Sequence, residues 1–219
     1  MRSPTFLIAS CSIALVLSLL GFMAPAAVLG DIMRDWSLSN TEAGWLGGAL
    51  FAGYIASVPI LTAYTDRIDP KRIYMASAMI SVIGNLGFGF LADGLWSGVA
   101  FRVLTGIGLA GTYMPGLKAL SDQLPAGRMQ QRGATYYTSV FALGSGLSIF
   151  VGGVAADMAD WRLAFAVAGA GAAVALVVVG IVLPFRAPEV PEGIRPPALD
   201  FRPVLRNGGV MAFVFSFFG

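Results

Sequence analysis

Arg102 is the one charged residue within a long apolar run, which makes it the first candidate for a functional role. The run covers residues 94–117 and is long enough to cross a bilayer. A charged side chain inside a bilayer costs several kcal/mol unless it faces protein or water, so such residues are functional candidates by default. At helical spacing, Gly106 and Tyr113 fall near the face of Arg102, with Thr105 at its edge. We therefore expect Arg102, Thr105 and Tyr113 to contribute to a binding or coupling site.

A second set of polar side chains lies on one helix face of the apolar run 133–156. Thr138, Ser145 and Ser148 share this face, and Asn85 is the one amide of another apolar run. These four residues are further candidates for contacts with a substrate or a coupling ion. The alternative is that their side chains only bond neighbouring helices, each contributing about 0.6 kcal/mol.

The sequence contains no nucleophile–base pair, phosphate-binding loop or cluster of metal ligands. It has no histidine, and its single cysteine, Cys11, excludes an internal disulfide. Carboxylates avoid the apolar runs, since Asp31, Asp93 and Asp157 fall at the ends of runs. We therefore expect no enzymatic activity, no cofactor, no metal and no proton coupling through a membrane-centre acid in these helices.

Apolar runs fill most of the chain and must position these polar side chains. The hydrocarbon core of a bilayer takes about 20 helical residues, and only helices or closed barrels satisfy the backbone inside it. Unbroken runs without alternation favour helices. Charged residues make up 12% of the chain, against about 25% in soluble proteins. We predict an all-α integral membrane protein with a six-helix domain over 1–185, whose transmembrane helices cover residues 6–30, 43–64, 73–92, 94–117, 133–156 and 163–185.

The distribution of Lys and Arg predicts the orientation of these helices. If the runs cross in succession, eleven of the 14 Lys and Arg residues fall on one side, whereas Arg34 and Arg162 fall on the other. Positive loops stay in the cytoplasm, so we expect a multi-pass protein of the plasma (inner) membrane with a cytoplasmic N-terminus. The alternative for the first run is a cleaved signal peptide ending near Ala24-Pro25-Ala26, although the run is long for one. The net charge of +2 is too small to indicate nucleic-acid binding.

The last part of the chain changes character. Residues 186–208 contain five prolines among arginines, which predicts a cytoplasmic linker near the membrane surface rather than a continuous helix. Residues 209–219 are apolar but too short to span a bilayer. We interpret them as the start of a seventh transmembrane helix in a chain that is truncated there. The alternative is a hydrophobic tail that lies in the membrane interface.

The turn after the second run combines an acid, a base and a basic pair, namely Asp66, Arg67, Lys71 and Arg72. This order resembles the signature loop of the major facilitator superfamily, Gly-x-x-x-Asp-(Arg/Lys)-x-Gly-(Arg/Lys)-(Arg/Lys). Thr62 replaces the first glycine, and Asp69-Pro70 replaces the second with one residue inserted. The resemblance implies that the four charged residues form a cytoplasmic gate, with Asp66 bracing it against the other half of a transporter.

Further motifs support this resemblance. The segment 102–110, RVLTGIGLA, is similar to the family's fourth-helix pattern Arg-x-x-Gln-Gly-x-Gly-x-Ala, and only Thr105 departs from it. Ser148 and Ile149 replace Gly-Pro in the family's antiporter pattern, which argues against an antiporter. Small residues let helices approach closely. On this ground we expect helix packing at seven glycines: Gly44, Gly48, Gly106, Gly108, Gly144, Gly152 and Gly153.

The resemblance implies a fold and a function. The fold would be two inverted three-helix repeats that form the N-terminal half of a secondary transporter, with a solute site at the membrane midplane. Arg102 would then contact an anionic solute or couple its movement to a gradient. The expected partners are the lipid bilayer, a small solute and a second six-helix half, which is either a missing C-terminal part or another copy. The alternative function is a stand-alone membrane receptor or scaffold that dimerises without transport.

Overall fold

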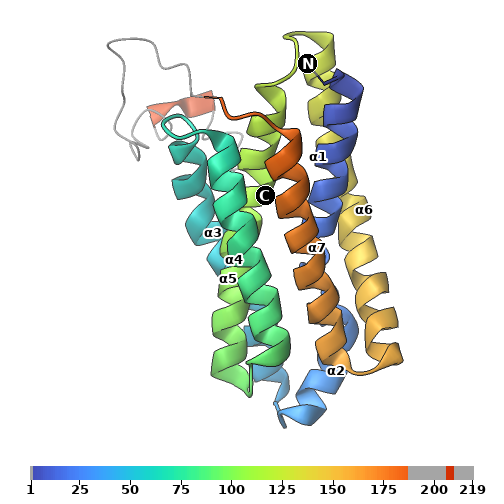
Figure 1. Cartoon of the computed structure of the whole chain (residues 1–219). Helices are drawn as coiled ribbons and strands as arrows, with labels where there is room; N and C mark the ends of the chain where they lie inside the picture. Colours follow the sequence, from blue (N-terminus) through green and yellow to red (C-terminus); the bar gives the residue numbers. More distant parts are fainter. Residues whose placement is uncertain (1, 187–205, 210–219) are drawn as a thin grey trace. The chain divides into compact units, whose positions relative to one another are not determined.

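The computed structural model describes residues 2–186 and 206–209, and the described residues form helices joined by short turns (Figure 1). The chain divides into two units, Met1–Pro188 and Glu189–Gly219. The first unit contains seven helices: α1 (Pro4–Ser18), α2 (Ala24–Asp35), α3 (Asn40–Tyr64), α4 (Pro70–Phe90), α5 (Leu95–Ser121), α6 (Arg128–Met158) and α7 (Trp161–Val182). Apart from Arg186 and residues 206–209, the expected linker over 186–208 and seventh helix over 209–219 lie outside the described residues.

The single helix expected over 6–30 is wrong, because α1 ends at Ser18 and α2 begins only at Ala24. Pro25 explains where the chain restarts. Proline lacks a backbone N–H and disfavours helical geometry in the residue before it, so the first turn of a helix is its favoured helical position. Pro25 lies in the first turn of α2, and residues 19–23 form a turn between the two helices. The other five expected helices lie within a few residues of α3 to α7.

Local signals set several helix ends. Ser39 and Glu42 form a capping box at the start of α3, in which the Glu42 carboxylate accepts from the backbone N–H of Ser39 at 2.9 Å. The Asp69 carboxylate caps α4, and the Asp160 carboxylate caps α7. Four of the described helices, α3, α4, α6 and α7, are long and apolar enough to cross a membrane.

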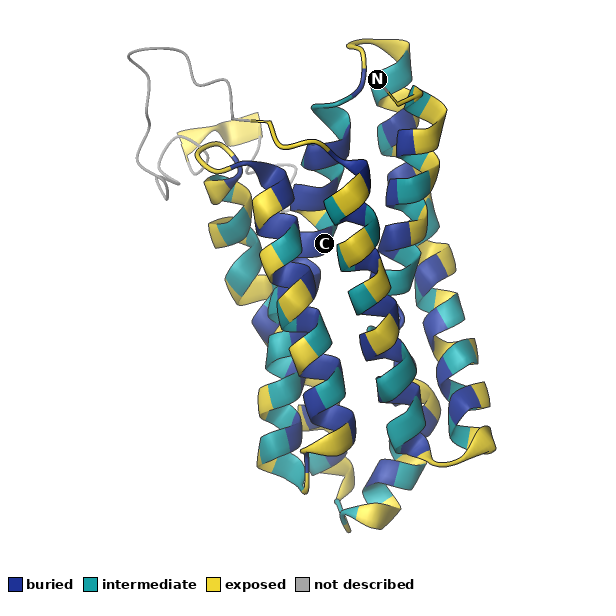
Figure 2. Cartoon of the chain, in the orientation of Figure 1, coloured by how far each residue is buried: buried dark blue, intermediate teal, exposed yellow. Residues whose placement is uncertain are grey.

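The helices pack as a bundle in which α4, α5 and α7 carry most of the buried residues (Figure 2). The closest pairs are α4 with α5, α3 with α5, and α4 with α7, while α6 packs on α1 and α7. In the most apolar stretch of α4, 56% of residues are buried, against 22% in α3 and in α6. Helices α3 and α6 therefore present broad exposed apolar faces.

Glycines on α5 lie at the tightest helix contacts. A Cβ atom at Gly106 would collide with the backbone carbonyl of Leu50, and one at Gly108 would collide with Ser81. On α6, Cβ atoms at Gly144 and Gly152 would press on Leu19 and Ala24. Backbone atoms cannot rotate away as a side chain can, so Gly106 and Gly108, which lie against backbone atoms, require glycine.

The remaining three glycines that the sequence singled out have more room. A Cβ at Gly153 would only reach ordinary contact with Ala27 at 3.9 Å. Around Gly44 and Gly48, no described residue lies within 4 Å of a Cβ position. Gly44 and Gly48 thus lie on the exposed face of α3 rather than at a contact inside this unit.

The bundle has two distinct ends (Figure 1). The N-terminus, the α3–α4 turn, the α5–α6 turn and the end of α7 lie at one end, which we call the N-terminal end. The α2–α3, α4–α5 and α6–α7 turns lie at the opposite end.

A glycine at a tight helix contact and a glycine that faces open space give a matched test of packing. We expect Gly106→Ala to lower the free energy of unfolding by about 2 kcal/mol, because the new methyl group must displace the backbone of α3. Gly44 lies on α3, the helix against which Gly106 packs, but faces open space. Gly44→Ala should therefore change the free energy of unfolding by no more than about 0.5 kcal/mol. Thermal unfolding of the purified chain in detergent measures both, and equal melting temperatures would contradict this account.

Candidate functional site

The break between α1 and α2 is held by Arg102. Its guanidinium donates one hydrogen bond to the Gly21 carbonyl at 2.8 Å and a second to the Phe22 carbonyl at 3.1 Å. The end of a helix leaves backbone carbonyls without partners, and lipid supplies none. Arg102 is 2% exposed and extends from α5, so it satisfies these carbonyls from within the bundle.

Ser148 completes the support from α6. Its hydroxyl donates to the Leu20 carbonyl at 2.5 Å and accepts from the backbone N–H of Met23 at 3.0 Å. The Ser148 side chain is fully buried. A single hydroxyl therefore bridges two residues of the turn between α1 and α2, and the break is held from α5 and α6 at once.

Asn85 approaches the same break from α4. Its amide nitrogen donates to the Ser81 carbonyl at 2.8 Å, and its oxygen lies where a side chain at Gly21 would be. Asn85 Oδ1 and Arg102 Nε are buried and have no hydrogen-bond partner within the described residues. Asn85, Arg102 and Ser148, three of the seven sequence candidates, thus converge on residues 20–23.

The other four candidates have different surroundings. Thr105 is buried, and its hydroxyl donates to the Phe101 carbonyl of its own helix. Ser145 and Thr138 also donate to carbonyls of their own helix, and Thr138 is exposed. Tyr113 is half-buried, with its ring centroid 4.9 Å from that of Phe141. These hydroxyls on α5 and α6 act within a helix, whereas Tyr113 belongs to an aromatic cluster.

The charged turn of residues 65–72 divides into an inner and an outer part. Lys71 is 4% exposed, and its ammonium donates to the carbonyls of Gly180 and Leu183 at 2.8 and 2.6 Å. The ammonium also lies 3.9 Å from the centroid of the Phe185 ring. Cations stabilise the C-terminal end of a helix, so Lys71 caps α7. Asp66, Arg67 and Arg72 are exposed.

The sequence alone did not single out Asp69 as a candidate residue. One carboxylate oxygen accepts from the backbone N–H of Lys71 at 2.8 Å, and the other accepts from the backbone N–H of Arg186, also at 2.8 Å. The Arg186 guanidinium in turn donates to the Asp122 carbonyl. The signal was present, because Asp69 occupies the place of the second glycine in the signature loop. The N-terminal end of the bundle is thus tied together by α4, α5 and α7.

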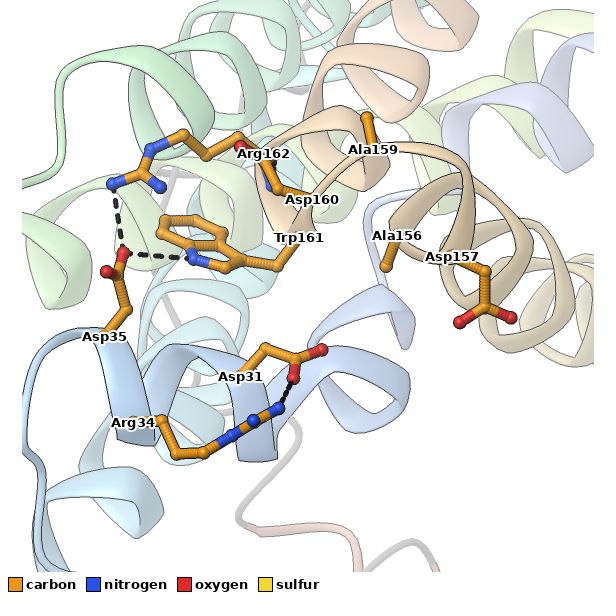
Figure 3. A pocket seen from close by; sticks show the side chains of 9 residues that line it. All are labelled: Asp31, Arg34, Asp35, Ala156, Asp157, Ala159, Asp160, Trp161 and Arg162. Carbon is orange, nitrogen blue, oxygen red and sulfur yellow. Dashed lines mark hydrogen bonds and ion pairs between the residues drawn. The ribbon is translucent and has the colours of Figure 1, made fainter.

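An open pocket of about 590 Å³ lies at the opposite end (Figure 3). Asp35 forms an ion pair with Arg162 at 3.1 Å and accepts from the Trp161 indole at 3.2 Å, which ties α2 to α7. Asp31 pairs with Arg34 on the same helix. Exposed ion pairs contribute roughly 0–1 kcal/mol each. These pairs connect surface elements and leave the buried break as the stronger candidate for function.

A bundle of apolar helices with a broken first helix defines a helical multi-pass membrane protein. The sequence model of the Major Facilitator Superfamily matches residues 11–219, and the chain belongs to this family. The chain is 24% identical over 169 residues to the niacin transporter NiaP of Acinetobacter baylyi, covering 77% of this chain and 36% of that protein. It is 30% identical over 143 residues to the protein spinster of Drosophila melanogaster, covering 65% of this chain and 23% of that protein.

The fold is also found in solved transporter structures. The POT family transporter PepTSo superimposes with a TM-score of 0.70 at 16% identity, over 94% of this chain and 42% of PepTSo. The chain therefore spans less than half the length of this structure and about a third or less of the two relatives.

Ser148 and Ser145 give a matched test of the break. We expect Ser148→Ala to lower the free energy of unfolding by about 1–3 kcal/mol, because it leaves a buried carbonyl and a buried N–H unpaired. Ser145→Ala should have little effect, since its hydroxyl only bonds a carbonyl of its own helix. Thermal unfolding in detergent measures the difference, and equal losses would show that Ser148 does not support the break.

Lys71→Met should loosen the end of α7 without removing a large side chain. The variant keeps the aliphatic part but loses both bonds to the α7 carbonyls, so backbone amides near Leu183 should exchange hydrogen at least about tenfold faster. Hydrogen exchange read by mass spectrometry measures this. Arg72→Met, at the exposed neighbouring position, is the control. Unchanged exchange in Lys71→Met would contradict the cap.

Proposed function

We propose that this chain forms the first six-helix half of a secondary transporter that moves a small solute across a membrane by alternating access. The supporting observation is the broken first helix, whose free carbonyls lie inside the bundle against Arg102. Transporter sites are typically formed by discontinuous helices near the midplane. Family membership and relatives named as transporters agree with this function.

The two-repeat arrangement belongs to this proposal. If α1–α2, α3 and α4 form one repeat and α5, α6 and α7 the other, then α3 packs on α5 as α6 packs on α1. The third members, α4 and α7, pack on each other. This reciprocal pattern is what an inverted repeat produces.

The proposed orientation places the N-terminal end of the bundle in the cytoplasm and the protein in the plasma membrane. The described basic residues at that end outnumber those at the opposite end, where Arg34 and Arg162 lie, in agreement with the positive-inside rule. In this orientation, the hydrogen bonds that Lys71 and Asp69 make to the end of α7 and to Arg186 lie on the cytoplasmic side.

A small anionic solute fits the charge of the break. Arg102 forms no ion pair with a carboxylate among the described residues, although it is nearly fully buried. An uncompensated cation in a low-dielectric region attracts an anion. The relative named as a niacin transporter supports a small organic molecule.

A second six-helix half is the proposed partner. The exposed faces of α3 and α6 would pack against it, with Gly44 and Gly48 allowing close approach. Asp66, Arg67 and Arg72 are exposed at the N-terminal end, as the proposed gate against the second half requires. Lys71 belongs to the same motif, and its bonds to α7 support a role in holding the end of α7 beside the proposed gate.

Alternating access can be tested without knowing the solute. Phe51 is 46% exposed and contacts the ring of Phe22 at the break. In a Cys11→Ala background, we expect Phe51→Cys to react with a membrane-impermeant maleimide in right-side-out and in inside-out vesicles, because the site opens to both sides in turn. Phe150→Cys, on the exposed side of α6, should react in neither. Labelling of Phe51→Cys from one side only would reject transport by alternating access.

A further inference from the structure

We propose that Phe22, Phe51, Tyr54, Tyr113 and Phe141 form a binding surface for the flat aromatic ring of a solute that carries one negative charge. The inference rests on the proposed transport function and names the class of solute for that function. We call these five residues the aromatic surface. They come from the α1–α2 break, α3, α5 and α6.

The rings form a connected set around the break. Phe22 contacts Phe51 edge to face, with centroids 5.9 Å apart and an interplanar angle of 74°. Phe22 also contacts Phe141, with centroids 5.6 Å apart, and Phe141 contacts Tyr113 at 4.9 Å. Such distances and tilts are those of favourable aromatic pairs. Tyr54 is partly buried against the same core cluster as Phe22 and Tyr113.

This set differs from an ordinary aromatic core. The cluster at the opposite end includes Phe88 and Phe165, which are 1% and 0% exposed and serve only packing. Members of the aromatic surface are instead half-buried or exposed, so parts of their rings stay open to a further ring. Aromatic pairs contribute about 0.5–1.5 kcal/mol beyond area burial, enough to favour a flat ring over a puckered one.

The tyrosine hydroxyls indicate a polar ligand group. Buried Tyr137 donates to the Thr112 carbonyl at 3.0 Å, and buried Tyr74 bonds Ser18 at 3.2 Å. In contrast, the hydroxyls of Tyr54 and Tyr113 bond no described residue. Tyr54 and Tyr113 are half-buried, and neither hydroxyl is among the buried atoms that lack a partner in the described residues, so these two O–H groups are accessible to donate to a solute.

Arg102 decides the sign of the solute charge. Aromatic faces alone would also attract a cation. However, Arg102 donates to the Phe22 carbonyl and so places a positive charge at the backbone of one member of the aromatic surface. The carboxylates that form ion pairs in the described part of the chain, Asp31, Asp35 and Asp122, all lie at the ends of the bundle. The field at the aromatic surface therefore favours an anion.

Binding of small probes to the purified protein tests the class. We expect benzoate to bind, cyclohexanecarboxylate to bind at least about tenfold more weakly because it is not flat, and benzylammonium not to compete. Equilibrium dialysis with labelled benzoate, competed by the other two, measures this order. Equal affinity for the two carboxylates, competition by the cation, or no benzoate binding at about 1 mM would overturn the proposal. If benzoate does not bind, the aromatic surface would instead pack against side chains of the second half.

Variants assign the binding to the aromatic surface. Phe141→Leu should weaken benzoate binding about tenfold, and Tyr113→Phe about fivefold through the lost hydroxyl donor. Phe150→Leu, an exposed ring elsewhere on α6, is the matched control and should leave affinity unchanged. Circular dichroism and melting temperature establish that each variant is folded. If folded Phe141→Leu binds like the parent protein, the inference fails.

The two proposals fail separately. Maleimide labelling of Phe51→Cys from both sides requires no solute, so transport can stand when ring recognition is rejected. Conversely, flat-ring selectivity with labelling from one side only would keep the aromatic surface and reject alternating access.

Discussion

The fold of this chain depends on one requirement, that the free carbonyls of a broken membrane helix find donors inside the protein. Arg102 and Ser148 supply those donors to residues 20–22 from two different helices. A break in lipid without such partners would cost several kcal/mol for each unsatisfied group. The same bonds bring α5 and α6 to the α1–α2 turn and place Phe22 among the rings of Phe51 and Phe141. The turn between α1 and α2 therefore both receives the supporting hydrogen bonds and contributes Phe22 to the candidate solute surface.

The N-terminal end of the bundle follows the same principle with other residues. Lys71 satisfies carbonyls of α7, and Asp69 satisfies the backbone N–H of Arg186. Half of the charged turn thus stabilises helix ends, which explains why Lys71 is buried although it lies in a strongly charged sequence. Asp66, Arg67 and Arg72 are exposed and are the residues that the proposed second half would meet.

Much of the fold could be predicted from the sequence, because long apolar runs leave few choices in lipid. Helices α3 to α7 followed from hydropathy. The break near Gly21 was hidden, since Pro25 lies within an unbroken apolar run and proline occurs inside membrane helices such as α3 and α5. For the candidate site, spacing identified Arg102, Asn85 and Ser148 as special, but a single helix face cannot reveal which carbonyl on a distant segment each side chain meets. Phe22 and Asp69 were missed because the rings that contact Phe22 and the Arg186 N–H that Asp69 accepts from belong to distant segments.

The cap on α7 also has a consequence for the order of synthesis. Lys71 leaves the ribosome 109 residues before Gly180, the nearer of its carbonyl partners in the sequence. Its ammonium group therefore has no helix end to bind while α4 first enters the bilayer, and it gains its carbonyl partners only after α7 is made. Arg102 has the opposite timing, because residues 21 and 22 are made 80 or more positions earlier. During translation, Lys71 is therefore made before its carbonyl acceptors, whereas Arg102 is made after its own.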